Sequence, residues 1–218
     1  VVTDSLFEQC SSTKGGAIYL NGTDIRVTDS NFTKTGIHPN MTITQDANGG
    51  AIYIGGNNAF ISHGYFKMSS AYEGGFIYIS GDDAKIEYST FTQSTAYNAG
   101  GAIDVHGNNA LITESNFIML NSSKTGGAVS IEGDGVNITN SNFTQTSVEG
   151  ANTKGGAIYV GGNDVDILNC KFNMTRSFGG DGGSIYVDGN GTDIKDCSFN
   201  LAAALPGNGG AMYIAGRR

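Results

Sequence analysis

Three residues of this chain, Asp104, His106 and Glu132, have the types and the spacing that could do chemistry. Asp104 and His106 are two positions apart, so on a strand their side chains lie on one face. Glu132 follows one sequence repeat later on the same face. A polysaccharide hydrolase or lyase needs one carboxyl to protonate a leaving oxygen and another to activate water. One candidate function is therefore a glycan-cleaving enzyme in which these three residues are catalytic.

The same residues are also explained as solvated polar side chains. No cluster of arginines or lysines flanks them to bind an acidic sugar, and neither carboxyl has an evident reason for a raised pKa. The three cysteines lack metal-ligand spacing. The sequence therefore favours a function without catalytic residues, metal or cofactor.

An internal repeat supplies the elements that must position these side chains. A Gly-Gly pair followed by a small and an aliphatic residue begins at Gly15, Gly49, Gly74, Gly100, Gly126, Gly155, Gly182 and Gly209. Seventeen residues after each of the first seven starts stands Phe32, Phe66, Phe91, Phe117, Phe143, Phe172 or Phe199. Another glycine follows each start by seven residues, from Gly22 to Gly216, and it predicts a turn with positive φ.

Three further columns of the repeat are apolar in every coil. They are Ile18, Ile52, Ile77, Ile103, Val129, Ile158, Ile185, Met212; Leu20, Ile54, Ile79, Val105, Ile131, Val160, Val187, Ile214; and Val27, Ile61, Ile86, Ile112, Ile138, Ile167, Ile194. With the phenylalanines they predict four internal ladders. The fold class is all-β: one right-handed parallel β-helix domain over residues 1–218, with about eight coils of 25–34 residues. A propeller needs a longer repeat, and the L-x-x-L-x-L pattern of leucine-rich repeats is absent.

Charge and hydropathy exclude several classes of partner. The formal net charge of −8 and the pI of about 4.7 disfavour nucleic acid and anionic membrane surfaces. No stretch approaches the roughly 18 to 20 apolar residues of a membrane-spanning helix.

All variation in repeat length falls between a phenylalanine and the next Gly-Gly pair. One edge of the rod therefore carries every insertion, and the longest, 33–48, includes Gly36, His38 and Pro39 and is expected to project as a loop. Insertions confined to one side indicate a binding face or simply a corner that tolerates length changes. Both interpretations remain open.

The first and last residues continue the repeat without an evident cap. Val1 enters at the register of Arg26, and the final coil stops at the register of Asp24. Exposed strand edges favour pairing with another coil. Two explanations follow: head-to-tail stacking of copies into a fibre, or an excerpt from a longer β-helix.

The repeat resembles that of the adhesin-like right-handed β-helix proteins on the surfaces of methanogenic archaea. Its pattern is S-x-F, a variable segment, GGAIY, a glycine turn and I-x-x-S-x-F. The resemblance covers essentially the whole chain. It extends less closely to chlamydial polymorphic outer-membrane proteins, because this chain lacks the asparagine of their FxxN repeat. The resemblance implies attachment or envelope structure at a cell surface, and it transfers no catalytic residue.

Eight N-x-Ser/Thr sequons fall in turns, loops or columns assigned to the outer face: Asn21, Asn31, Asn40, Asn121, Asn137, Asn142, Asn173 and Asn190. About four would be expected by chance from this Asn and Ser/Thr content. They indicate a glycosylated extracellular protein, although an Asn/Thr-rich solenoid also generates sequons without selection for glycans.

Two further outward or stacked sets carry functional interpretations. Tyr19, Tyr53, Tyr78, Tyr159, Tyr186 and Tyr213 share one outward column, which could contact sugars or a neighbouring rod, or only stabilise the sheet.

Cys170 and Cys197 replace the serine of S-x-F in adjacent coils; two buried free thiols are favoured over a disulfide.

The sequence as a whole predicts an extracellular structural or adhesive module of a cell surface, a glycoprotein that stacks coil on coil with copies of itself or within a longer chain. Surface glycans are its candidate ligands. The polysaccharide hydrolase or lyase at Asp104, His106 and Glu132 is the alternative.

Overall fold

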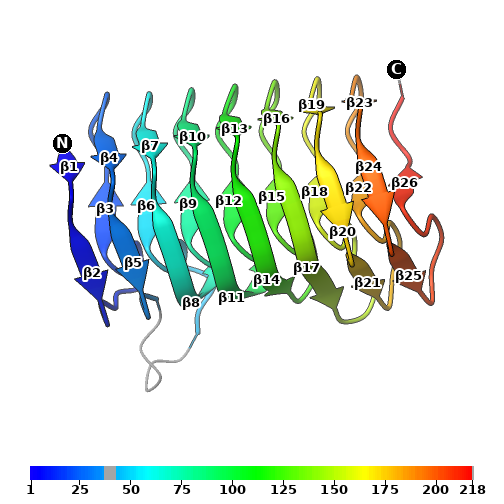
Figure 1. The fold of residues 1–218 in the computed structure, drawn as a ribbon, viewed down its shortest axis with the longest axis horizontal. Coiled ribbons are helices and arrows are strands. Elements are labelled where there is room, and N and C mark those ends of the chain that lie inside the picture. Colours follow the sequence, from blue (N-terminus) through cyan, green and yellow to red (C-terminus); the bar gives the residue numbers. More distant parts are fainter. Residues whose placement is uncertain (37–42, 218) are drawn as a thin grey trace.

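The computed structural model describes residues 1–36 and 43–217, and it shows a parallel β-solenoid of about eight turns (Figure 1). This confirms the all-β fold and the coil number predicted from the repeat. The right-handed winding and the single domain stay predictions. Among the described residues there is no helix that could span a membrane.

Each coil contributes a strand to each of three parallel sheets, and the last two coils contribute a second short strand to one of them. Sheet A contains β1 (Val2–Thr3), β4 (Arg26–Thr28), β7 (Phe60–Ser62), β10 (Lys85–Glu87), β13 (Leu111–Thr113), β16 (Asn137–Thr139), β19 (Asp166–Leu168) and β23 (Asp193–Lys195). Sheet B contains β2 (Leu6–Glu8), β5 (Asn31–Thr33), β8 (Tyr65–Glu73), β11 (Thr90–Ala99), β14 (Asn116–Ser122), β17 (Asn142–Glu149), β20 (Lys171–Asn173) and β24 (Ser198–Asn200), with β21 (Arg176–Phe178) and β25 (Ala203–Leu205). Sheet C contains β3 (Ile18–Leu20), β6 (Ile52–Ile54), β9 (Ile77–Ile79), β12 (Ile103–Val105), β15 (Val129–Ile131), β18 (Ile158–Val160), β22 (Ile185–Val187) and β26 (Met212–Ile214).

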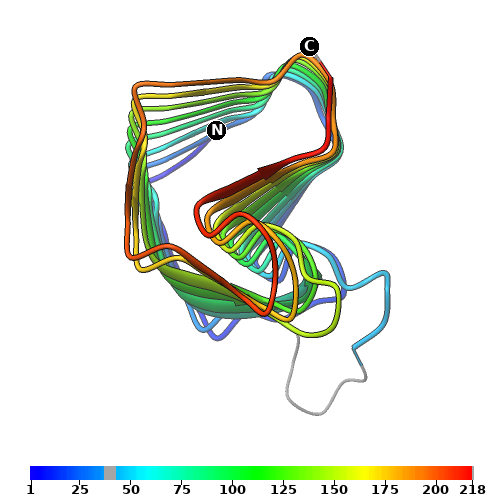
Figure 2. The same cartoon turned by 90° about the vertical axis from the view of Figure 1, so that its right-hand side faces the viewer.

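Seen along the rod, the coils superpose except at the edge that carries the insertions (Figure 2). The register pairs like with like; Phe91 lies beside Phe117, and Ile103 beside Ile77. Neighbouring rings of the phenylalanine ladder, which Phe7 joins, stack with centroids 4.7 to 5.1 Å apart. The four predicted ladders are confirmed as the core. Stacked rings stabilise it by roughly 0.5–1.5 kcal/mol a pair beyond burial.

The coil changes direction at residues in the left-handed region, with φ between 46° and 69°. One column is the first glycine of each Gly-Gly pair; the others are Asp24, Asn58, Asp83, Asn109, Gly135, Asp164, Gly191; Asp4, Asp29, His63, Tyr88, Glu114, Asn140, Asn169, Asp196; and Gln9, Lys34, Met68, Gln93, Met119, Gln145, Met174, Leu201. The predicted turn with positive φ recurs, but the positive φ does not belong to the column from Gly22 to Gly216; among the described residues it belongs to the residue two positions later, from Asp24 to Gly191.

The two glycines of each pair are required for different reasons, which Gly100 and Gly101 illustrate. Gly100 has a φ of +59°, a conformation that an L side chain rarely adopts. A Cβ on Gly101 would collide with the carbonyl oxygen of Gly127 in the next coil. The second glycine therefore lets the backbones of neighbouring coils approach closely.

We expect Gly101→Ala to lower the free energy of unfolding by about 2 to 4 kcal/mol, because the collision is with backbone and cannot be relieved by a rotamer change. Gly210 occupies the same column, and the nearest atom to a Cβ there is 3.8 Å away. Gly210→Ala in the same chain should therefore be nearly neutral. Urea unfolding followed by circular dichroism measures both; equal losses in the two variants would contradict this account of the second glycine.

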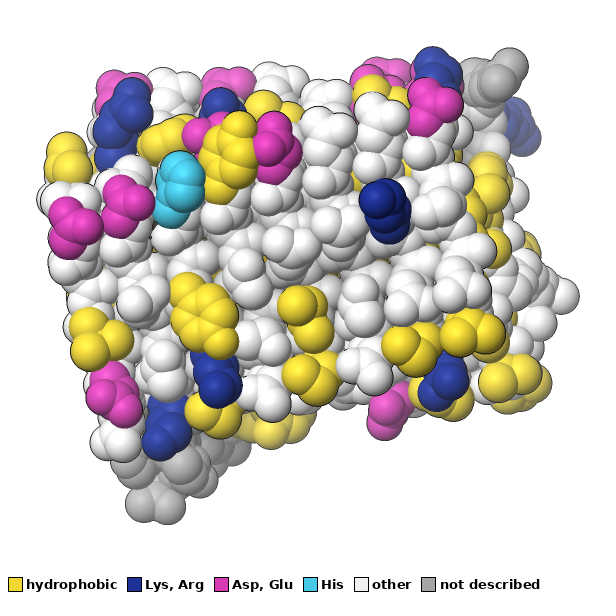
Figure 3. Space-filling view, in the orientation of Figure 1, with side chains coloured by type: hydrophobic (Ala, Val, Ile, Leu, Met, Phe, Trp, Pro, Cys, Tyr) yellow, Lys and Arg dark blue, Asp and Glu magenta, His cyan; other side chains and the backbone are white. Residues whose placement is uncertain are grey.

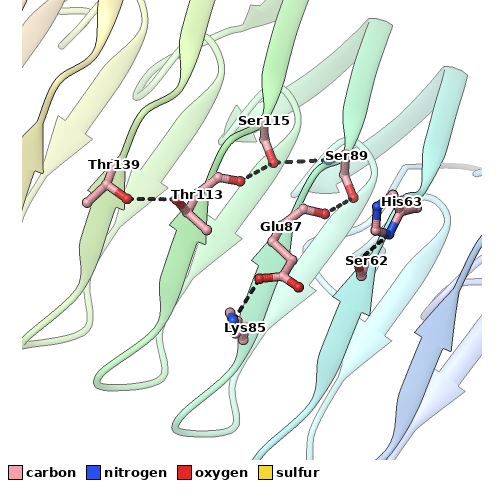
Figure 4. A network of polar contacts seen from close by, with 8 residues as sticks. All are labelled: Ser62, His63, Lys85, Glu87, Ser89, Thr113, Ser115 and Thr139. Atoms are coloured by element: carbon pink, nitrogen blue, oxygen red, sulfur yellow. Dashed lines mark hydrogen bonds and ion pairs between the residues drawn. The ribbon is translucent and has the colours of Figure 1, made fainter.

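Serines link sheet A to sheet B at the corner two residues before the phenylalanine in five coils, at Ser5, Ser30, Ser89, Ser115 and Ser141, two of which Figure 4 shows. The Ser115 hydroxyl donates to the carbonyl oxygen of Thr113, 2.8 Å away, and accepts from the backbone N–H of Ser89, 3.2 Å away. The Ser115 N–H in turn donates to the hydroxyl of Ser141. All of these serines except Ser5 are buried, so they satisfy backbone groups that water cannot reach.

Ser115→Ala should destabilise the fold by about 1 to 3 kcal/mol, because it leaves the Ser89 N–H and the Thr113 carbonyl without their partner. Ser115→Cys is the matched control. Cys170 holds the same column position with its sulfur 3.3 Å from the carbonyl oxygen of Leu168. Thermal unfolding should rank the cysteine variant above the alanine variant, and the reverse order would contradict this role of the hydroxyl.

Candidate functional site

The structure brings Asp104 and His106 together at β12. Asp104 alternates with the core residues Ile103 and Val105, and it is only 1% exposed because neighbouring side chains cover it. The His106 side chain, just after the strand, is 38% exposed, and its Nε2 lies 2.9 Å from Asp104 Oδ2. Oδ1 of Asp104 is buried and has no hydrogen-bond partner. Glu132 lies one coil further on, just after β15.

Glu73 is a member of this cluster that the sequence analysis missed. It ends β8, directly before Gly74, and its Oε1 accepts a hydrogen bond of 2.8 Å from Asn98 Nδ2. Ligand atoms of Glu73, Asp104 and His106 all lie within 4.8 Å of one another. Glu73 is the residue directly before one Gly-Gly pair, and His106 lies six residues after the first glycine of the following pair. The repeat does not show which of its columns lie close to one another across the coil, so the sequence could not predict that Glu73 joins the cluster.

The surroundings shift several pKa values upward. The pKa of His106 is raised, chiefly because its imidazolium donates a hydrogen bond to Asp104, although burial opposes the shift. Burial raises the pKa of Glu73 and of Glu132, and the charge of Asp104 adds to both shifts. The expectation that no carboxyl here has a reason for a raised pKa is therefore wrong for Glu132.

This arrangement can hold a proton or a cation between carboxylates and an imidazole. Asp104 cannot itself contact a large substrate, since it is buried beneath its neighbours and bonded to His106. The groups that can meet a ligand are His106, Glu132 and the partly buried Glu73.

The tyrosine column forms two stacks, separated by the coils that carry Asp104 and Ser130. Tyr19 and Tyr53 have ring centroids 4.9 Å apart, and Tyr53 and Tyr78 5.2 Å. In the second stack the Tyr186 and Tyr213 centroids are 4.8 Å apart, and those of Tyr159 and Tyr186 are 6.0 Å apart. Because the rings face one another along the rod, their faces are largely covered by neighbouring rings. This geometry favours the stabilising interpretation of the column over sugar stacking.

None of the sequon asparagines that the structure describes is buried. Asn21, Asn31, Asn142 and Asn190 are exposed, Asn121, Asn137 and Asn173 are half-buried, and Asn40 lies outside the described residues. Some amides already bond along the rod; Asn142 Nδ2 donates to Asn116 Oδ1 over 3.0 Å. Their placement on the outside agrees with the expectation from the sequence, while occupancy by glycans stays a prediction.

Cys170 and Cys197 occupy the serine column as free thiols. Cys170 is buried, and Cys197 is only partly buried, which corrects the expectation of two buried thiols. The neighbouring thiol of Cys170 lowers the pKa of Cys197 to about 7. The same pairing, with burial, raises the pKa of Cys170.

In a Cys10→Ser background, Cys197 should be alkylated by iodoacetamide with a rate that rises through pH of about 7, because a lowered pKa populates the thiolate at lower pH. Cys170→Ala removes the neighbouring thiol and should move that midpoint upward by about one pH unit or more. Stopped reactions analysed by peptide mass spectrometry give both profiles. An unchanged midpoint in Cys170→Ala would show that Cys170 does not set the pKa.

The edge that carries the insertions has a shallow depression of about 440 Å³ between β17 and β21. It is lined by Gln145, Thr146, Ser147, Glu149, Met174, Arg176 and Phe178. Pairing of β17 with β21 sets Ser147 beside Arg176 and Glu149 beside Phe178. Phe178 is 36% exposed. An aromatic ring thus lies among amide, hydroxyl, carboxylate and guanidinium groups on the edge that carries the insertions.

Comparison with models of known protein families finds no match to this chain, and comparison with curated proteins finds none either.

Proposed function

We propose that this chain is an extracellular structural and adhesive module of a cell surface, and that carbohydrate is the ligand of its insertion edge. The observation that carries the proposal is the depression between β17 and β21. Recognition sites for small molecules combine apolar or aromatic surface with a few placed polar groups. Phe178 offers a ring to the apolar side of a sugar, and Gln145, Glu149 and Arg176 offer groups that can pair with its hydroxyls.

The rest of the solenoid suits a structural support. The core ladders run through every coil, so the interior is filled with side chains. Figure 3 shows a broad face over sheets A and B that is mostly backbone and side chains that are neither hydrophobic nor charged, with hydrophobic and charged groups scattered among them. Such a face remains hydrated. Stacking of further coils in register, from a copy or from a longer chain, belongs to the same proposal, because like columns pair throughout the rod.

The alternative of a glycan-cleaving enzyme at Asp104, His106 and Glu132 has less support. Asp104 is 1% exposed and engaged by His106, so its carboxyl is not presented to a glycosidic oxygen. A carboxyl pair placed on either side of a bound sugar is what that chemistry requires. We therefore propose adhesion and not cleavage.

A glycan array probed with the labelled chain, multimerised on beads, tests adhesion directly. Binding to a defined set of glycans is expected, and Phe178→Ala should weaken it by about tenfold or more, because the ring supplies the apolar contact. Tyr97→Ala is the matched control, since Tyr97 is an exposed aromatic residue of β11 outside the depression. It should bind as the unaltered chain does.

Two outcomes would contradict the proposal. One is an array with no bound glycan under multivalent presentation, and the other is an equal loss in Phe178→Ala and Tyr97→Ala. Sedimentation of the chain over a concentration series tests end-to-end stacking separately.

A further inference from the structure

The cluster of Glu73, Asp104 and His106 combines close ligand atoms with an unmet polar group. The ligand atoms lie within 4.8 Å of one another. Asp104 is held in β12, which pairs with β9 on one side and β15 on the other, so its carboxylate is rigidly placed. Oδ1 of this 1%-exposed residue has no hydrogen-bond partner. A buried carboxylate oxygen without a donor is unfavourable, so a cation bound at Oδ1 would stabilise Asp104.

The equivalent positions three coils further along show how the fold otherwise balances charge here. Lys154 takes the position of Glu73, Asp188 that of His106, and Tyr186 that of Asp104. Lys154 Nζ lies 2.5 Å from Asp188 Oδ2 and also over the Tyr186 ring. In that coil a lysine neutralises the carboxylate.

No such ammonium sits within the cluster of Glu73, Asp104 and His106. Glu73 replaces the lysine, Asp104 adds a second carboxylate, and Glu132 lies close enough for the charges of Asp104 and His106 to act on it. Besides His106, the exposed Lys124 is the cation whose charge affects the pKa of Glu73, and it does so without a hydrogen bond to that carboxyl. Two carboxylates and an imidazole therefore converge at a place where the same fold elsewhere holds a cation.

We propose that Glu73, Asp104 and His106 bind one divalent transition-metal ion of the zinc type. Zinc accepts carboxylate oxygen and imidazole nitrogen, and three protein ligands leave a fourth position for water or a ligand group. The imidazole disfavours calcium and magnesium, which take oxygen ligands. The ion pairs with the unmet Oδ1 of Asp104, and the Asn98 amide, which donates to Glu73, orients that ligand.

Calorimetric titration of the chain, stripped with EDTA and dialysed, with ZnCl₂ tests the site. One equivalent of Zn²⁺ should bind, and Glu73→Gln and His106→Ala should each weaken binding by about tenfold or more. Both replace side chains that are partly exposed, and circular dichroism verifies their fold. The visible absorption of bound Co²⁺ gives a second readout, which should disappear in His106→Ala.

His63→Ala is the matched control. Its imidazole lies elsewhere, with Nδ1 2.7 Å from the Ser62 hydroxyl, so this variant should bind Zn²⁺ as the unaltered chain does. The proposal is overturned if the unaltered chain binds no stoichiometric Zn²⁺, or if it binds CaCl₂ in preference to ZnCl₂. It is equally overturned if Glu73→Gln and His106→Ala keep full affinity, because the ion would then sit on other residues.

Discussion

In-register hydrogen bonding between successive coils is the constraint on which the rest of this structure depends. Each strand pairs in parallel with the same segment of the next coil, so outside the insertions a strand residue lies beside its counterpart one repeat away. A side chain that suits one coil must therefore suit its neighbours. Phenylalanine stacks on phenylalanine, isoleucine packs on isoleucine, and buried serine hydroxyls serve the backbone of the adjacent coil. Stability is distributed along the rod through these repeated contacts.

The backbones of neighbouring coils approach so closely at some positions that only glycine fits there. The second glycine of every pair except the last sits against the backbone of the next coil. In the column from Gly22 to Gly216, each glycine from Gly56 onward sits against a glycine carbonyl of the coil before. The first glycine of each pair turns the chain with positive φ. At other corners the left-handed conformation is taken by residues as large as Met68 and Tyr88. The strain of these residues is offset by the ladder bonds on both sides, which hold the coil to one path.

Uniform ladders make each departure from them informative. The tyrosine column is broken at Asp104 and Ser130, and the break coincides with the cluster that includes Glu73 and His106. The edge where repeat length varies coincides with the depression around Phe178. In both places the core beneath is unchanged, so the differences alter surface chemistry and leave the scaffold intact. Because surface residues can change without altering the core, one rod can carry both the proposed adhesive edge and the proposed cation site.

The sequence by itself determined the number of coils, the apolar columns, the phenylalanine ladder and the registration of like residues. These follow from the repeat alone, because each strand bonds to the equivalent segment of the next repeat whatever the length of the insertion between them. Tertiary structure alone decided that Glu73 meets His106, that Asp104 is buried, and that β17 and β21 frame a depression. Such contacts join different columns, so they depend on the path of the coil in cross-section. That path is set by left-handed corners whose residues range from glycine to tyrosine, and residue type therefore carries too little information to predict it.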